Sequence, residues 1–168
     1  DPVEVARLIV LRRLERGPRT RAQLEEACAR RGVPEWAVTQ LLDRFTELGL
    51  VDDEAYARAW VRSRHAGRGL GRRALRHELL TRGVDRDLID EAVAEVTADD
   101  EDAAARALVR ARLGGLARYD HTTQRRRLVG LLARRGYSSA VAARVVAQEL
   151  AARDDGLGDD VPGGDLSP

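Results

Sequence analysis

The sequence predicts an all-α protein made of three tandem three-helix repeats, and two observations lead to that prediction. Apolar residues recur three and four positions apart, as on one face of a helix, and nowhere alternate with a period of two over five or more residues. An Arg-Gly pair followed by an apolar residue also occurs three times, with Gly32, Gly83 and Gly136 lying 51 and 53 residues apart. Similar apolar segments flank each glycine, so the chain repeats one unit of about 50 residues three times.

Each repeat divides into three predicted helices. In the second repeat Tyr56 and Trp60 are four residues apart, as are Leu75 and Leu79, and Ile89 belongs to a third apolar stripe. We expect these side chains to face the core. The predicted helices span 2–16, 20–31 and 34–48 in the first repeat, 53–66, 71–82 and 85–97 in the second, and 99–113, 121–135 and 138–153 in the third.

The predicted repeats cover 1–51, 52–98 and 99–153, and a further segment follows them. Residues 154–168 contain five Asp, several Gly and almost no apolar side chain, so we expect an acidic disordered tail. A repeat of this size buries too little surface to be stable alone, so neighbouring repeats should pack together.

The expected helix boundaries agree with this division. Asp52 and Asp53 can cap the helix that contains Tyr56, and Asp85 and Ser138 can cap later helices. The three repeat glycines stand where a helix ends in a left-handed residue. Gly17-Pro18 and the segment from Gly67 to Gly71 are predicted to break helices at equivalent places.

Composition favours a cytoplasmic protein that does not enter a membrane. No stretch approaches the roughly 18 uncharged apolar residues that a membrane span requires, and the single cysteine, Cys28, cannot form an intramolecular disulfide. We expect Cys28 to be a small core residue. Methionine is absent, even at position 1, so we expect the natural protein to begin upstream of Asp1.

Charge is strongly segregated although the net charge is only +1, and every one of the 29 basic residues is arginine. Residues 58–82 hold eight Arg and one acid, residues 83–102 hold one Arg and nine acids, and residues 103–153 hold eleven Arg and two acids. Clustered cations favour a polyanionic partner, because phosphate contacts release counterions. Codon bias in a GC-rich genome is the favoured explanation of the missing lysine, but it does not explain the segregation of charge.

The arginines of the two basic segments are the candidate binding residues. In the third repeat few acids stand one helical turn away to neutralise them. A solvated charged face is the alternative interpretation of the same pattern. The candidates are Arg58, Arg62, Arg64, Arg68, Arg72, Arg73, Arg76, Arg110, Arg112, Arg125, Arg126 and Arg127.

The sequence contains no convincing catalytic, cofactor or metal site. The three histidines, His65, His77 and His121, do not share a metal-ligand spacing, and we expect them on the surface. The glycine-rich segment from Gly67 to Gly71 lacks both a preceding strand and a Lys-Ser/Thr pair, so it predicts a turn and no nucleotide loop. We therefore expect a protein that is not an enzyme.

Several motifs of the second repeat resemble the hallmark of the RecX family. Their order within a triple repeat is specific, although each motif alone is weak. The match covers about 150 residues and is looser in the first and third repeats. Binding residues are therefore assigned from the family resemblance only in the second repeat. The motifs are Leu50-Val51-Asp52-Asp53-Glu54-Ala55-Tyr56-Ala57, Trp60-Val61-Arg62-Ser63-Arg64, Gly69-Leu70-Gly71-Arg72-Arg73-Ala74-Leu75-Arg76, Glu78-Leu79, Arg82-Gly83-Val84 and Ile89.

The resemblance implies a regulator of homologous recombination and DNA repair, including the SOS response. It implies an elongated, curved helical array that binds the filament of RecA recombinase on single-stranded DNA and inhibits its ATPase and strand-exchange activities. The expected partners are RecA and single-stranded DNA, with duplex DNA as a further one, and the chain should be a monomer. A helix-turn-helix-like DNA-binding regulator stays open as the alternative.

Overall fold

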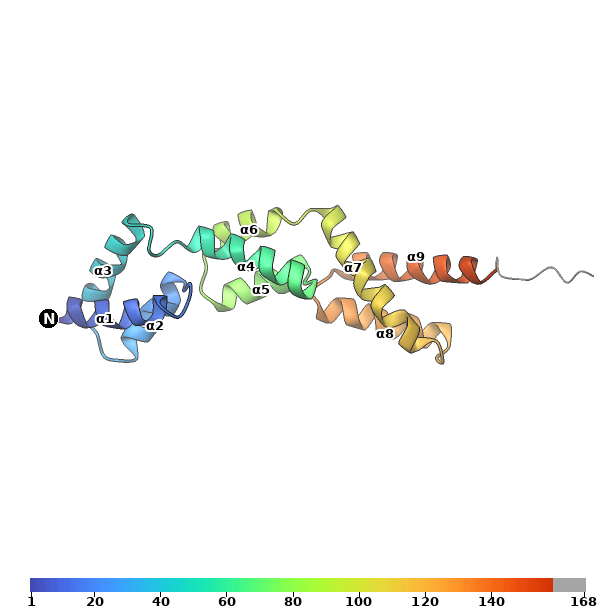
Figure 1. The fold of residues 1–168 in the computed structure, drawn as a ribbon, viewed down its shortest axis with the longest axis horizontal. Helices are drawn as coiled ribbons and strands as arrows, with labels where there is room; N and C mark the ends of the chain where they lie inside the picture. The colour runs from blue at the N-terminus through green and yellow to red at the C-terminus, as the bar shows by residue number, and fades with distance from the viewer. Residues whose placement is uncertain (159–168) are drawn as a thin grey trace, which may run out of the picture. The chain divides into compact units, whose positions relative to one another are not determined.

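The computed structural model describes residues 1–158, and over this range it confirms the all-α prediction, with nine α-helices, one short 3-10 helix and no strand (Figure 1). All helix boundaries except the last agree with the predicted ones within three residues. The helices are α1 (Pro2–Leu14), α2 (Arg21–Ala29), α3 (Glu35–Glu47), α4 (Asp53–Arg68), α5 (Arg72–Thr81), α6 (Arg86–Ala94), α7 (Ala98–Leu113), η1 (Gly114–Leu116), α8 (His121–Arg134) and α9 (Ser139–Gly158).

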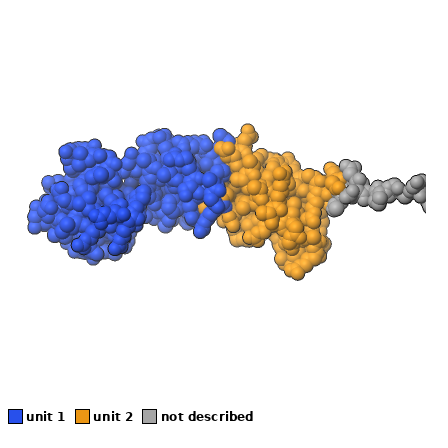
Figure 2. All heavy atoms as spheres, in the orientation of Figure 1, with its two compact units in different colours: residues 1–68, 74–97 blue, residues 69–73, 98–168 orange. Residues whose placement is uncertain are grey.

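The chain forms two compact units (Figure 2). Unit 1 consists of Asp1–Arg68 and Ala74–Thr97, and so holds α1 to α4, α6 and most of α5. Unit 2 consists of Gly69–Arg73 and the chain from Ala98 onward, so the turn before α5 packs with α7, α8 and α9. Helices of two predicted repeats share unit 1, and the division into three repeats therefore stays a prediction.

Helices α1, α2 and α3 pack around a core of small and medium apolar side chains. Val10 of α1, Leu24 of α2 and Leu42 of α3 are almost completely buried, and each contributes about 1.5–3 kcal/mol of hydrophobic stabilisation. Cys28 is fully buried in the same core, as predicted, and burial raises the pKa of its thiol.

The second group of helices confirms part of the predicted core. Leu75 and Leu79 of α5 and Ile89 of α6 are buried, as their spacing predicted. The core prediction is wrong for Trp60 and Tyr56, which both stay partly exposed.

The reason for that error lies in the face that α4 turns toward the core. The buried residues of α4 are Ala57 and Val61, each one position after an aromatic residue. A shift of one position rotates a side chain by roughly 100° around a helix, which moves both rings to the edge of the core.

The core of unit 2 lies between α7, α8 and α9. Val109 of α7, Leu132 of α8 and Val145 of α9 have no exposed surface. Tyr137, which precedes α9, is also buried, and its hydroxyl donates a 2.6 Å hydrogen bond to the carbonyl of Gly69. Burial raises the pKa of Tyr137 to about 12, so the phenol stays a hydrogen-bond donor at neutral pH.

Helix α9 is longer than predicted. It extends to Gly158, five residues beyond the expected end at 153, so the beginning of the predicted tail is helical. The remaining residues of that segment, 159–168, lie outside the described residues.

Predicted caps are present at several helix starts. The Oδ1 of Asp52 accepts a hydrogen bond from the N–H of Ala55 at 3.0 Å. Asp85 caps α6, and the Oγ of Ser138 accepts from the N–H of Val141 at 3.2 Å. These oxygens satisfy N–H groups that have no partner within the helix.

Glycine positions follow the prediction. The backbone of Gly32, Gly83 and Gly136 has φ values of +72°, +77° and +91°, as expected for a left-handed residue after a helix. The predicted break between Gly67 and Gly71 is also present, because α4 ends at Arg68. The next residue, Gly69, has a φ of +62°.

In unit 1, the start of α2 is held by residues of the second repeat. Thr20 is fully buried, and its hydroxyl donates a 2.6 Å hydrogen bond to the carbonyl of Arg82. The same Oγ1 accepts from the N–H of Gln23, which caps α2. The Asp53 carboxylate, at the start of α4, accepts from the N–H of Arg21 at 2.9 Å. We call these contacts the α2 junction.

Unit 2 contains the equivalent arrangement, which we call the α5 junction. The N–H of Gly71 donates to the carbonyl of Arg135 at 2.8 Å, next to the third repeat glycine. The Glu101 carboxylate, in the first turn of α7, accepts from the N–H of Arg72 at 3.1 Å. In both junctions a carboxylate near the start of one helix satisfies a backbone N–H at the start of another, about 30 residues earlier in the chain.

Gly71→Ala should weaken the α5 junction. A Cβ at this position would lie 2.6 Å from the carbonyl oxygen of Gly136, a backbone atom that cannot swing away. We expect the free energy of unfolding to fall by about 1–3 kcal/mol in urea titrations. Gly114→Ala is the control, since its Cβ would have nothing within 4 Å. Equal stability of the two variants would contradict a tight junction.

Candidate nucleic-acid interface

Several of the arginines predicted to bind nucleic acid form ion pairs within unit 1. Arg58 pairs with Glu54 at 3.1 Å and with Glu95 at 2.9 Å. Arg76 pairs with Asp90 of α6. These pairs are largely exposed, so each contributes little to stability and leaves the guanidinium accessible to solvent.

Arg64 has a more confined position. Its guanidinium donates two hydrogen bonds to the Glu78 carboxylate, at 3.1 and 2.8 Å, and lies 5.1 Å from the centre of the Trp60 ring. The indole Nε1 donates to the same carboxylate at 2.7 Å, and the Arg82 guanidinium lies 3.8 Å from the centre of the Trp60 ring. The hydrogen bond from Arg64 is the main cause that lowers the pKa of Glu78.

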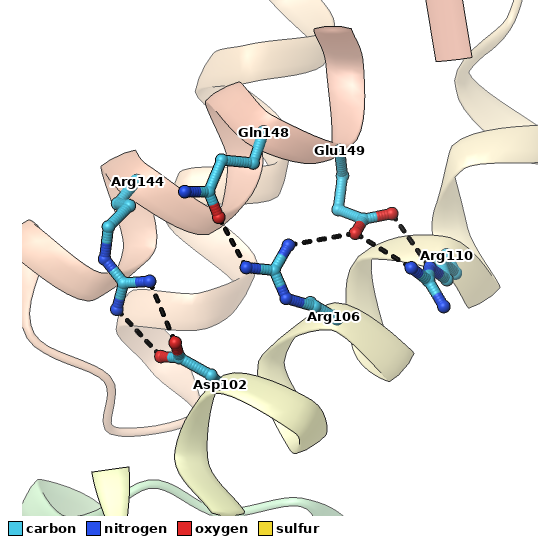
Figure 3. A network of polar contacts seen from close by, with 6 residues as sticks. All are labelled: Asp102, Arg106, Arg110, Arg144, Gln148 and Glu149. Atoms are coloured by element: carbon cyan, nitrogen blue, oxygen red, sulfur yellow. Dashed lines mark hydrogen bonds and ion pairs between the residues drawn. The ribbon is translucent and has the colours of Figure 1, made fainter. Parts of the chain in front are cut away.

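In unit 2 the acid Glu149 of α9 neutralises two arginines of α7 (Figure 3). Arg110 donates to it at 2.9 and 3.1 Å, and Arg106 donates at 3.1 Å. Arg144 of α9 pairs with Asp102 of α7 through two hydrogen bonds of 2.9 and 2.8 Å. The sequence pattern considered only acids one helical turn away, and the acid that pairs with Arg106 and Arg110 lies on another helix.

The ion pairs of this network lower the pKa values of its two acids, Glu149 and Asp102. Hydrogen bonds from Arg110, and then from Arg106, lower the pKa of Glu149 although burial opposes that shift. Arg144 lowers the pKa of Asp102 in the same way. Arg72 also lies near an acid, with its Nε 3.7 Å from the Oε1 of Glu101.

A second group of predicted arginines is exposed and, among residues 1–156, has no ion-pair partner. Arg62 belongs to unit 1, and the other members belong to unit 2. Arg68 is also exposed. Guanidinium groups that form no ion pair keep their hydrogen-bond donors available for phosphate, although Asp120 lies near enough to Arg126 to interact with its charge. The group consists of Arg62, Arg73, Arg112, Arg125 and Arg126.

Tyr119 organises the basic segment at the start of α8, and sequence reasoning missed it. Arg127 lies 4.1 Å and Arg118 lies 4.8 Å from the centre of its ring, and Arg118 donates a 2.7 Å hydrogen bond to its hydroxyl. Asp120 caps α8 by accepting from the N–H of Thr123 at 2.7 Å. A tyrosine within an arginine-rich loop was the available signal. We define the α8 basic segment as Arg118, Tyr119, Arg125, Arg126 and Arg127.

The described part of the chain contains neither a candidate metal site nor a candidate membrane-spanning helix. Residues 1–156 contain no group of three or more His, Cys, Asp or Glu side chains placed to hold a metal ion. None of the helices described is both long and apolar enough to cross a membrane.

Comparison with known families assigns the chain. Residues 52–93 match the family model described as "RecX, second three-helix domain", and residues 99–146 match "RecX, third three-helix domain". The regulatory protein RecX of Streptomyces coelicolor is 52% identical over 150 residues, which cover 89% of this chain and 80% of the relative. The chain belongs to the RecX family.

Further RecX relatives agree with this assignment. The regulatory protein RecX of Thermobifida fusca is 53% identical over 147 residues, covering 88% of this chain and 80% of the relative. The crystal structure of RecX from Lactobacillus salivarius superposes with a TM-score of 0.83, covering 90% of this chain and 98% of that one. At 18% sequence identity this second likeness concerns the fold alone.

The Glu149 network gives a pH-dependent prediction. Because the folded state lowers the pKa of Glu149, its ionised form stabilises the fold above the unfolded pKa of about 4.3, and that stabilisation disappears as the pH falls through the lower folded value. Glu149→Gln should lower the Tm by a few degrees at pH 7, and the difference from wild type should shrink toward about pH 3.

The control for this prediction is Glu47→Gln. Glu47 pairs with Arg44 at 3.0 Å, and both side chains are about two-thirds exposed, so the change should leave the Tm nearly unaltered at either pH. A Tm difference between wild type and Glu149→Gln that stays constant from pH 7 to pH 3 would contradict a stabilising carboxylate.

Proposed function

We propose that this RecX-family chain regulates homologous recombination by binding the RecA filament on single-stranded DNA and inhibiting its ATPase and strand-exchange activities. Two observations support the proposal. The chain belongs to a family whose relatives are named regulatory proteins. It also carries exposed arginines that form no ion pair among residues 1–156, and such arginines suit a phosphate-rich partner.

The α8 basic segment is the surface that we propose for the nucleic-acid contact. Arg125 and Arg126 are exposed and adjacent, and Arg127, which lies against the Tyr119 ring, directly follows them in sequence. Cations next to an aromatic ring suit single strands, whose phosphates and unstacked bases are both accessible. We propose a monomer that acts in the cytoplasm and has no catalytic activity of its own.

A helix-turn-helix-like DNA-binding regulator is the second candidate function, and the charge of α6 argues against it. This helix would correspond to the recognition helix of the second repeat. Its exposed residues include Asp87, Asp90 and Glu91, which the phosphates along a DNA groove would repel.

The test is the ATPase rate of RecA on single-stranded DNA, measured with increasing amounts of this protein. We expect inhibition at or below stoichiometric amounts. The double variant Arg125→Ala with Arg126→Ala should need an about tenfold higher concentration, since it lacks two phosphate contacts. The matched control is Arg12→Ala with Arg13→Ala on α1, which removes the same charge and should inhibit like wild type.

Salt dependence gives a second measurement on the same variants. If both arginines contact phosphates, the slope of log affinity against log salt for single-stranded DNA should fall by about 1.4 in magnitude. The proposal fails if wild type leaves the ATPase rate unchanged at stoichiometric amounts. Tight sequence-specific duplex binding under the same conditions would support the second candidate function.

A further inference from the structure

Unit 1 contains a groove of about 610 Å³ that the proposed function does not use. It lies between residues 16–19 of the α1–α2 turn, Leu50 before α4, and one face of α4. Leu50 is half exposed, although it is a large apolar side chain. We call this feature the α4 groove.

The α4 groove exists because α4 has two apolar faces. One face, with Ala57 and Val61, is buried in the core. The other face lines the groove. Its residues recur with the same helical spacing, and each stands one or two positions before a buried residue of the first face. Its alanines leave open space between the aromatic rings and the α1–α2 turn. This second face consists of Ala55, Tyr56, Ala59 and Trp60.

The aromatic wall of the groove is fixed in place before any partner binds. The Trp60 ring stacks on Tyr56 with their centres 6.0 Å apart and their planes at 10°. Its Nε1 is bound to Glu78, and Arg82 lies over the ring at 3.8 Å. A preorganised apolar wall loses little conformational entropy on binding, which favours affinity.

The rim of the groove is cationic on the side of the α1–α2 turn. Arg16 is exposed, and neither it nor Arg19 has an ion-pair partner within residues 1–156. The Arg19 guanidinium donates to the carbonyl of Pro18 at 2.8 Å, which holds it beside the groove. On the opposite side, the carboxylate of Asp52 is engaged by a backbone N–H of α4. An apolar wall beside two cations is complementary to an apolar side chain beside a carboxylate.

We propose that the α4 groove binds a peptide segment of a partner protein in which a large apolar side chain stands next to an Asp or Glu. The apolar side chain would pack on Trp60 and Ala59, and the carboxylate would pair with Arg16. This proposal does not depend on RecA or DNA binding.

The experiment uses Trp60 as the reporter. In a Trp36→Phe background Trp60 is the single tryptophan, so its fluorescence reports on the groove. The probes are eight-residue peptides that place Leu, Ile, Met or Phe next to Asp, with matched peptides that carry Asn in place of Asp. We expect at least one acidic peptide to shift the Trp60 emission in a saturable way, and its Asn version to bind about threefold or more weakly.

Variants of the groove locate the binding. Ala59→Gln and Ala59→Glu fill the groove with helix-compatible side chains, and each should weaken peptide binding about tenfold or more. Ala66→Gln and Ala66→Glu are the matched controls, on an exposed position of α4 outside the groove, and should bind like the parent. Arg16→Ala should remove the preference for Asp over Asn. Unchanged Tm values of all five variants exclude an effect through unfolding.

Three outcomes would overturn the proposal. The first is that no peptide of the panel shifts the Trp60 emission at millimolar concentration. The second is that Ala59 and Ala66 variants bind the peptides equally, which would place the contact elsewhere. The third is that a thymidine oligonucleotide shifts the emission while the peptides do not, which would make the groove a nucleotide site.

Discussion

The N–H groups at the start of a helix have no partner within that helix, and the architecture of this chain depends on how α2 and α5 satisfy theirs. In the α2 junction Asp53 and the buried hydroxyl of Thr20 make the connections, and in the α5 junction Glu101 has the role of Asp53. The core of α1, α2 and α3 and the core of unit 2 consist mainly of aliphatic side chains, with few aromatic ones, and a core of this size contributes limited stability. The hydrogen bonds of the two junctions therefore determine which inter-helix turns pack against each other.

Much of the fold could be predicted from the sequence because its signals are local. Apolar spacing gave the helices, and the capping oxygens of Asp52, Asp85 and Ser138 could be recognised from their neighbours. The partial exposure of Trp60 could not be inferred, since a stripe of apolar residues on α4 does not reveal that the helix has two apolar faces. Ion-pair partners on other helices could not be predicted from the sequence either. Glu149, for example, lies 39 residues after Arg110.

The candidate arginines differ in the environment of the acid that faces them. Glu101 and Glu149 are buried, so breaking their pairs would leave a carboxylate without compensation in a place where water is scarce. The acids that face Arg58 and Arg76 are exposed, and water can replace the guanidinium there at little cost. A phosphate can therefore compete for Arg58 or Arg76 more easily than for Arg106, because losing Arg106 would leave the buried Glu149 with less compensation. The burial of the acid therefore distinguishes arginines whose partner depends on them from arginines that water can replace.

The α2 junction also has a consequence for the order in which the chain folds. The core of α1, α2 and α3 joins residues that are close in sequence, whereas the hydrogen bond from Thr20 to Arg82 spans 62 residues. Closing a long loop costs entropy before its contacts form, so local three-helix cores should appear first and the junction later. The local cap of α2, in which Thr20 accepts from the N–H of Gln23, can form before this junction, whereas the hydroxyl donates to Arg82 only once the second repeat has folded. Folding of the second repeat supplies the Arg82 carbonyl to Thr20 of the first. The folding of one repeat is thereby coupled to the folding of the next.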